Sequence, residues 1–328
     1  MKNIADIVYN RYFLAFFLLW LAASCGISMY EPERNLLGQL LIALFYLVQF
    51  LLIFFFVRPG LAPFRSTSLA DGLSEKAPEG MAPAGNAGAG SASCPGYMVQ
   101  MKNVRTDTLF LLLVYLILMT VEFTLVRSWY LEKRTGEMLA LFWTGYAAIP
   151  AIYFFLRGYR LSDAGITTEQ FGPFLRYSVV SCLLLLPFML VATNSAMYMF
   201  SGNLTVGQRC FGIVFAFLYG FVTAGFFEEF FFRALLQSRL AGLVCSEAGG
   251  LFLSSILFAL YHLPSRIITT NGSIGHAFAM TLSGQMLISP IYGLLWLRTR
   301  NLMIPVVVHS LMDAVYGFYQ INKAYGIF

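Results

Sequence analysis

Long apolar stretches alternate with short polar segments along the whole chain. Most stretches hold about 20 residues, enough for an α-helix to cross the ~30 Å hydrocarbon layer of a bilayer. Because the apolar runs are continuous, they predict an all-α polytopic bundle and exclude a transmembrane β-barrel, whose strands alternate apolar and polar residues. The stretch at 248–263 is short, so we expect about eight or nine spans. The stretches cover residues 12–30, 35–57, 108–126, 138–156, 177–208, 210–237, 248–263, 278–297 and 302–319.

The composition supports a membrane protein. Apolar residues make up 59% of the chain, charged residues 11%, and the mean hydropathy is +0.72. An average soluble domain has about 45–50% apolar and about 25% charged residues. So few charges cannot cover a water-exposed surface, and this excludes a soluble globular enzyme.

The distribution of basic residues predicts the orientation. With nine spans and the N-terminus inside, most of the 21 basic residues fall on the inner side, as the positive-inside rule requires. We therefore expect a multi-pass protein of the plasma or inner membrane with a cytoplasmic N-terminus. The net charge of +5 does not indicate a nucleic-acid partner, because the basic residues are scattered through loops.

The polar segments divide the chain into four parts. Residues 1–57 form an N-terminal two-helix membrane hairpin, residues 58–107 a long loop, residues 108–176 accessory membrane helices with a surface segment, and residues 177–328 the membrane core. Within the loop, residues 77–96 are mostly Ala, Gly, Pro and Ser. Such a segment buries too little apolar surface to offset its ordering entropy, which predicts a flexible linker.

Ionisable residues inside membrane spans are costly, so each one is a functional candidate. All but one of them lie in the last third of the chain. The exception, Glu122, lies near the end of its span beside Arg127, and we interpret it as an interfacial or structural charge. The full set is Glu122, Glu228, Glu229, Arg233, His262, His309 and Asp313.

The adjacent carboxyls of Glu228 and Glu229 have different predicted roles. On a helix Glu229 lies four residues before Arg233, which is the favourable order for an ion pair. Glu228 projects about 100° away from Glu229. We expect Glu229 to pair with Arg233 and hold the helix, while Glu228 is free to act as a general base. The alternative is a buried ion pair with a spare acid.

Two further motifs place histidines in apolar helices. Phe258 and His262 share a helical face, with His262 near the helix end before Pro264, and His309 shares a face with Asp313. A lone histidine such as His262 is more often structural, and a His–Asp pair can position a hydrogen-bond donor or bind a metal. Because polar groups do not face lipid, all these side chains must point inward. They can therefore meet in one water-filled cavity within the C-terminal helices.

The order and spacing of these motifs resembles the CPBP family, which comprises the type II CAAX prenyl proteases and the bacterial Abi proteins. The resemblance covers roughly residues 177–319. The family pattern often has Gly after the motif arginine, where Ala234 stands here. The motifs are Glu228-Glu229-x-x-x-Arg233, Phe258-x-x-x-His262 and His309-x-x-x-Asp313.

The resemblance implies an intramembrane endopeptidase of the glutamate type that needs no cofactor. Its substrate would be a membrane-associated or lipidated protein or peptide, in CAAX-like or peptide and bacteriocin processing. Glu228 and His262 would activate the attacking water, and His309 and Asp313 would donate hydrogen bonds to the oxyanion. The supporting residues would be Glu229, Arg233 and Phe258.

Three alternatives remain open on the sequence. A zinc-dependent membrane metalloprotease could use Glu228, His262, His309 or Asp313 as ligands, although the chain has no HExxH motif. A non-enzymatic bacteriocin-immunity or membrane scaffold protein would not need the whole set of motif residues. A proton-coupled transporter is disfavoured, because the buried charges cluster at one end of the chain without symmetric halves.

Overall fold

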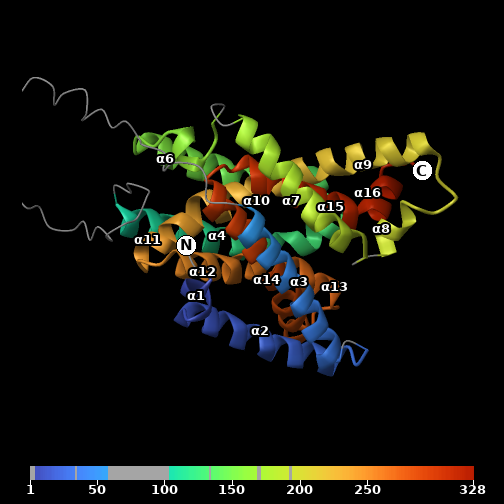
Figure 1. Cartoon of the computed structure of the whole chain (residues 1–328), viewed down its shortest axis with the longest axis horizontal. Coiled ribbons are helices and arrows are strands. Elements are labelled where there is room, and N and C mark those ends of the chain that lie inside the picture. Colours follow the sequence, from blue (N-terminus) through green and yellow to red (C-terminus); the bar gives the residue numbers. More distant parts are fainter. Residues whose placement is uncertain (1–3, 34, 58–102, 133, 168–170, 192–193) are drawn as a thin grey trace, which may run out of the picture.

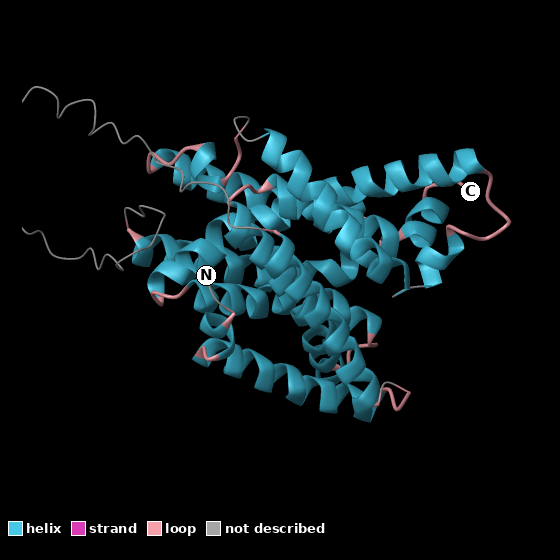
Figure 2. Ribbon diagram, viewed as in Figure 1, coloured by secondary structure: helices cyan, strands magenta, loops and turns pink. Residues whose placement is uncertain are grey.

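The computed structural model describes residues 4–33, 35–57, 103–132, 134–167, 171–191 and 194–328. Within this part of the chain every regular element is a helix, which confirms the all-α bundle (Figure 2). Eight of the described helical segments are long and apolar enough to cross a membrane, so the multi-pass membrane class is confirmed. These segments are Arg11–Tyr30, Leu36–Phe56, Val104–Leu125, Thr135–Leu156, Phe171–Leu190, Val206–Leu243, Glu247–Thr269 and Ile274–Thr299.

The N-terminal hairpin consists of α2 (Arg11–Tyr30) and α3 (Leu36–Phe56), preceded by the short α1 (Ala5–Val8). Both long helices begin at an asparagine, the residue type that best satisfies the free N–H groups of a first turn. The side chain of Asn10 accepts a hydrogen bond from the backbone N–H of Tyr12, and Asn35 does the same for Gly38.

The accessory helices follow the residues 58–102, which lie outside the described part of the chain. The predicted loop at 58–107 falls largely on them, and the next helix already begins at Val104. The accessory elements are α4 (Val104–Leu131), α5 (Thr135–Phe142), the π-helical η2 (Trp143–Ala148), α6 (Ile149–Leu156) and the 3₁₀ turn η3 (Leu161–Ala164).

The C-terminal half contains the remaining spans. It starts with α7 (Phe171–Val191) and α8 (Asn194–Tyr198). One long helical segment follows: α9 (Val206–Gly220), η4 (Phe221–Gly225), α10 (Phe226–Glu229), η5 (Phe230–Gln237) and α11 (Ser238–Leu243). The last elements are α12 (Glu247–Tyr261), α13 (Leu263–Thr269), α14 (Ile274–Thr299), α15 (Met303–Tyr316) and α16 (Phe318–Ala324).

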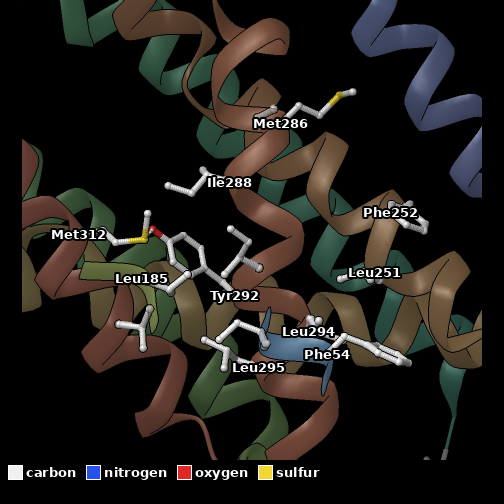
Figure 3. Close-up of a cluster of buried hydrophobic side chains, with 14 of the residues drawn as sticks. Phe54, Leu185, Leu251, Phe252, Met286, Ile288, Tyr292, Leu294, Leu295 and Met312 are labelled. Carbon is white, nitrogen blue, oxygen red and sulfur yellow. Dashed lines mark hydrogen bonds between the residues drawn. The ribbon is translucent and has the colours of Figure 1, made fainter. Parts of the chain in front are cut away.

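Helix α14 is the central helix of the bundle. Of the eight candidate spans it is the most buried, with 72% of its apolar window inside the protein. Side chains from α3, α7, α12 and α15 pack around it (Figure 3). The central position of α14 matters for the site, because neighbouring helices hold this helix in place. Its residues that face α10 and α15 therefore have fixed positions. The cluster in Figure 3 includes Phe54, Leu185, Leu251, Phe252, Ile288, Tyr292, Leu294 and Met312.

The hairpin packs directly on this central helix, with α2 and α3 lying along α14 and α2 also against α12 (Figure 1). The indole N–H of Trp20 donates to the carbonyl of Ser283, at 3.3 Å, and the guanidinium of Arg298 donates to the carbonyl of Phe54. The hairpin therefore covers one side of the helix that supports the functional site.

Candidate functional site

The acidic pair and its arginine are buried in the middle of the bundle. Glu228 is 5% exposed, and Glu229 and Arg233 are fully buried. Nε of Arg233 donates to Oε2 of Glu229 at 2.9 Å, the pairing that their spacing predicts. Nη1 of Arg233 donates to Ser289 on α14 at 3.0 Å, and the guanidinium lies 4.6 Å from the ring centroid of Phe258. Phe258 thus packs against the positive charge of this pair.

His309, from α15, lies between the carboxyl groups of the site. Its Nδ1 is 2.8 Å from Oε1 of Glu229, and because the carboxylate accepts, Nδ1 is the donor. Its Nε2 faces Oε2 of Glu228 at 3.8 Å and Oδ2 of Asp313 at 3.5 Å. Glu229 therefore holds His309 as well as Arg233, a second contact that the sequence did not indicate.

Two residues of α14 support the site, and sequence reasoning missed both. The ring of Tyr292 stacks on the imidazole of His309, with centroids 4.5 Å apart and planes inclined by 15°. The hydroxyl of Tyr292 donates to the sulfur of Met312 at 3.2 Å, a contact visible in Figure 3. Ser289, about one turn before Tyr292 on the same helix, accepts a hydrogen bond from Arg233. The only sequence signal for the pair is their three-residue spacing, which puts both side chains on one helix face.

His262 contacts a backbone carbonyl and neighbouring rings. Its Nδ1 is 3.0 Å from the carbonyl of Phe258, and because a carbonyl accepts, Nδ1 donates and Nε2 of the neutral ring is left as an acceptor. The ring centroid of Phe258 lies 5.0 Å from that of His262 and 6.1 Å from that of His309. The structure thus brings Glu228, Glu229, His309 and Asp313 together, while His262 joins them through an aromatic ring.

A cavity of about 400 Å³ reaches the site beside Asp313. It lies between α9–η4 and α15–α16, and the side chain of Asp313 is 36% exposed in it. Of the site residues only Asp313 lines this cavity, and the other acids and His309 are nearly closed to solvent. Tyr219, Thr223, Tyr316 and Gln320 also line it.

The arrangement supplies a base and a donor side by side. Oε2 of Glu228 accepts no hydrogen bond from the described residues, and it faces the same nitrogen of His309 as Asp313 does. Hydrolysis of a peptide bond needs a base near the water and a donor near the carbonyl oxygen. Among the described residues no group of three or more His, Cys, Asp or Glu side chains is arranged to hold a metal ion.

Of the two sequence interpretations of Glu122, an interfacial or a structural charge, the structure contradicts the interfacial one. It is 3% exposed, and the hydroxyl of Tyr146 on η2 donates to its Oε1 at 2.9 Å. An acid near a span end is not distinguishable by sequence from one that turns inward, because the packing partner lies on another helix.

A comparison with known protein families found a match over part of the chain. Residues 210–315 match the family model described as Type II CAAX prenyl endopeptidase Rce1-like. The match runs from α9 into α15 and contains all seven motif residues of the site, but it leaves out α2 to α7. No curated protein and no solved structure was found to match the chain. The family match confirms the resemblance seen in the motifs: the chain is an intramembrane peptidase, and its residues 210–315 are similar to the Rce1-like endopeptidases.

Proposed function

We propose that the protein is an intramembrane endopeptidase of the glutamate type, which hydrolyses a peptide bond without a metal ion. One observation carries the proposal: Glu229 holds His309 through Nδ1 at 2.8 Å, so that Nε2 faces Oε2 of Glu228 at 3.8 Å. The buried base Glu228 and the fixed imidazole of His309 then lie side by side, where both can act on one peptide bond.

Glu228 acts as the general base in this mechanism. Its Oε2 takes a proton from water while the water oxygen bonds to the carbonyl carbon of the scissile peptide bond. His262, with Nδ1 donating to a backbone carbonyl, offers Nε2 to orient the same water. The low dielectric of the membrane interior strengthens both interactions.

His309 stabilises the oxyanion of the tetrahedral intermediate. As an imidazolium it donates from Nδ1 to Glu229 and from Nε2 to the oxyanion. Asp313 adds a second donor in its protonated form, 3.5 Å from the same nitrogen. When the C–N bond breaks, Glu228 returns its proton to the leaving amine.

The substrate proposed for this site is a membrane-associated or lipidated polypeptide, with CAAX-like cleavage or peptide and bacteriocin processing as its setting. The family match supports a peptide substrate, and the cavity beside Asp313 gives it a polar route to the reacting groups. We also propose a plasma or inner membrane location with the N-terminus cytoplasmic, which the distribution of basic residues supports.

The test uses the full-length protein in proteoliposomes and a farnesylated peptide with a CAAX C-terminus, with its unprenylated form alongside. The released fragment is measured by mass spectrometry. Replacing the general base in Glu228→Gln should reduce turnover by about 10²–10⁴-fold while leaving the yield of folded protein unchanged. Glu137→Gln is the matched control, because Glu137 is exposed on α5 and pairs with Arg134.

Equal cleavage by wild type and Glu228→Gln would contradict the mechanism. The peptides of cells that express each form should also differ by a fragment that is present only with the wild type, and this fragment identifies the substrate. No cleavage in vitro together with identical peptides in both cell populations would favour the non-enzymatic scaffold.

A further inference from the structure

The cavity beside Asp313 extends along the end of α15 to Gln320, the third residue of α16. The backbone N–H of Gly317 donates to the carbonyl of Asp313 at 2.8 Å, and the N–H of Ile321 donates to the carbonyl of Gly317 at 2.8 Å. Helical hydrogen bonding therefore continues from α15 into α16. Seven residues, about two turns, separate Asp313 from Gln320, so both lie on one face and ~10 Å apart along the helix.

The side chain of Gln320 is held from α8. The hydroxyl of Ser195, which is 5% exposed, donates to Oε1 of Gln320 at 2.9 Å and accepts from the backbone N–H of Tyr319 at 2.8 Å. The rings of Tyr198 and Tyr319 also pack together, with centroids 4.6 Å apart, and α8 lies beside α16 (Figure 1). One buried hydroxyl thus binds both the backbone of α16 and the amide of Gln320.

This contact leaves the nitrogen of the Gln320 amide for another partner. The amide is planar with its oxygen and nitrogen on opposite sides, so Nε2 and its two N–H donors point away from Ser195. Within the described part of the chain Nε2 forms no hydrogen bond, and Gln320 is exposed where it lines the cavity. The hydroxyl of Thr223, on the opposite wall, already donates to the carbonyl of Tyr219 at 2.8 Å.

A fixed amide donor at this distance from Asp313 fits the backbone of an extended polypeptide. An extended chain advances about 3.3–3.6 Å per residue, so ~10 Å corresponds to about three residues. With its scissile carbonyl beside Asp313, such a chain presents another carbonyl to Gln320. None of the described residues that line the cavity is basic, so a neutral donor is the group available to hold the chain there.

We propose that Gln320 binds the substrate backbone, with Nε2 donating to a peptide carbonyl about three residues from the scissile bond, and that Ser195 is the residue that positions Gln320. The inference rests on the proposed function, since it places the scissile bond beside Asp313. Both residues lie outside the matched segment 210–315, one on each side of it. The binding of substrate thus depends on α8 and α16 as well as on the helices that carry the reacting groups.

The first measurement is steady-state kinetics of the full-length protein in proteoliposomes with the farnesylated CAAX peptide. Gln320→Met keeps the length of the side chain but removes its donors. One neutral hydrogen bond is lost, so KM should rise by about 2–10-fold while kcat stays unchanged, because the contact is made equally in the bound substrate and in the transition state. Lys323→Ala is the control, since it removes an exposed side chain from the same helix and should leave KM as it is.

The role of Ser195 is tested by a double-mutant cycle. Ser195→Ala frees the amide of Gln320 to rotate and should raise KM less than Gln320→Met does, and Ser195→Thr, which retains the hydroxyl, should restore part of the loss. The double variant should bind no worse than Gln320→Met alone, because Ser195 acts only through Gln320. Additive effects of the two changes would contradict this positioning role.

Peptide length locates the contact. The farnesylated peptide is shortened one residue at a time, in one series from the N-terminus and in a second from the C-terminus. The ratio of the KM of Gln320→Met to that of wild type should fall to one when the residue about three positions from the cleaved bond is removed on one side. A general change of structure would raise KM by the same factor for every peptide, and that result overturns the inference.

A binding measurement separates this inference from the proposed function. The Kd of a dye-labelled farnesylated peptide is measured by fluorescence anisotropy with Glu228→Gln, with and without Gln320→Met. Gln320→Met should raise Kd by the same factor as KM, and an unchanged Kd, or no binding of the peptide at all, overturns the role of Gln320. If Gln320→Met fails to fold, Gln320→Glu, which keeps Oε1 for Ser195, decides by the same measurement. The proposed function fails separately, when Glu228→Gln cleaves as fast as wild type.

Discussion

The carboxylate of Glu229 accepts hydrogen bonds from two side chains, from Nε of Arg233 at 2.9 Å and from Nδ1 of His309 at 2.8 Å. All three side chains are almost closed to solvent. Removing one partner of a buried ion pair leaves the other charge without compensation, which is more costly than losing a surface pair.

We therefore expect Glu229→Gln to destabilise the protein strongly. The free energy of unfolding should fall by about 3–5 kcal/mol, because Arg233 stays buried without its carboxylate. Thermal unfolding in detergent measures this change, and activity should be lost as well, since His309 loses its partner. Glu228→Gln is the control and should unfold like wild type. A stable Glu229→Gln beside an unstable Glu228→Gln would reverse the two roles.

The donor residues should affect the reaction rate more than substrate binding. His309→Ala should lower kcat by about 10²–10³-fold, the usual effect of losing an oxyanion donor, with KM nearly unchanged. Asp313→Ala should act in the same direction. Steady-state kinetics on the peptide distinguish this role from substrate recognition, for which KM would rise and kcat would stay normal.

At the scale of single residues, the sequence predicts local pairs but not pairs between helices. The contact of Glu229 with Arg233 follows from four-residue spacing within one helix. The contact of Glu229 with His309 joins residues 80 positions apart, and it depends on how α15 crosses α10. Tyr292 could not be found either, because a tyrosine in an apolar span gives no charge signal.

At the scale of elements, the segment with the acidic pair approaches α15 very closely. A Cβ on Gly225 of η4 would overlap Oγ of Ser310 and would lie 3.3 Å from the carbonyl oxygen of Val306. One turn earlier, a Cβ on Gly220 would lie 3.2 Å from Cβ of Asp313. The two glycines therefore allow η4 and α9 to pack closely against α15, the helix that carries the donors His309 and Asp313.

Gly225→Ala should push α15 away from the acidic pair. We expect a loss of about 1–3 kcal/mol of stability, as in other overpacked cores, and a lower kcat because His309 moves. Adding Ser310→Ala removes the hydroxyl that clashes, so the double variant should recover part of both losses. Gly207→Ala is the control, since nothing lies within 4 Å of a Cβ there. Equal losses in Gly225→Ala with and without Ser310→Ala would contradict this close packing.

The apolar pattern predicts the helices well but not their internal irregularity. The stretch at 210–237 reads as one continuous helix, and the structure has π-helical segments on both sides of the acidic pair, η4 and η5. Such wide turns occur often at functional sites, and they result from packing rather than from residue propensities. Helix ends at capping residues such as Asn35 are easier to predict.

At the scale of the whole molecule, the site draws on more of the chain than the family match covers. The match begins after the hairpin and the accessory helices, yet α2 and α3 pack on α14, the helix that carries Ser289 and Tyr292 of the site. The charge pattern predicted only that the acids of the last third converge. It could not predict which outer helices close around them, because lipid-facing and protein-facing surfaces of a membrane helix are both largely apolar.

At the same scale, the metal content of the whole purified protein distinguishes the metal-free mechanism from the zinc alternative. A catalytic zinc needs three protein ligands and an open position. Nδ1 of His309 is held by Glu229 and Nδ1 of His262 by a backbone carbonyl, which leaves Nε2 of each ring available as a zinc site would also require. Among the described residues, however, no three His, Cys, Asp or Glu side chains are arranged to hold a metal ion. We expect no stoichiometric metal by elemental analysis of the detergent-purified protein, and undiminished turnover after prolonged phenanthroline treatment. A buried zinc ion could dissociate slowly, so the metal content is measured on the treated sample as well. The metal-free mechanism would be contradicted by about one zinc per chain that is lost together with activity and restored together with it on adding zinc. Zinc, rather than Glu228, would then activate the water.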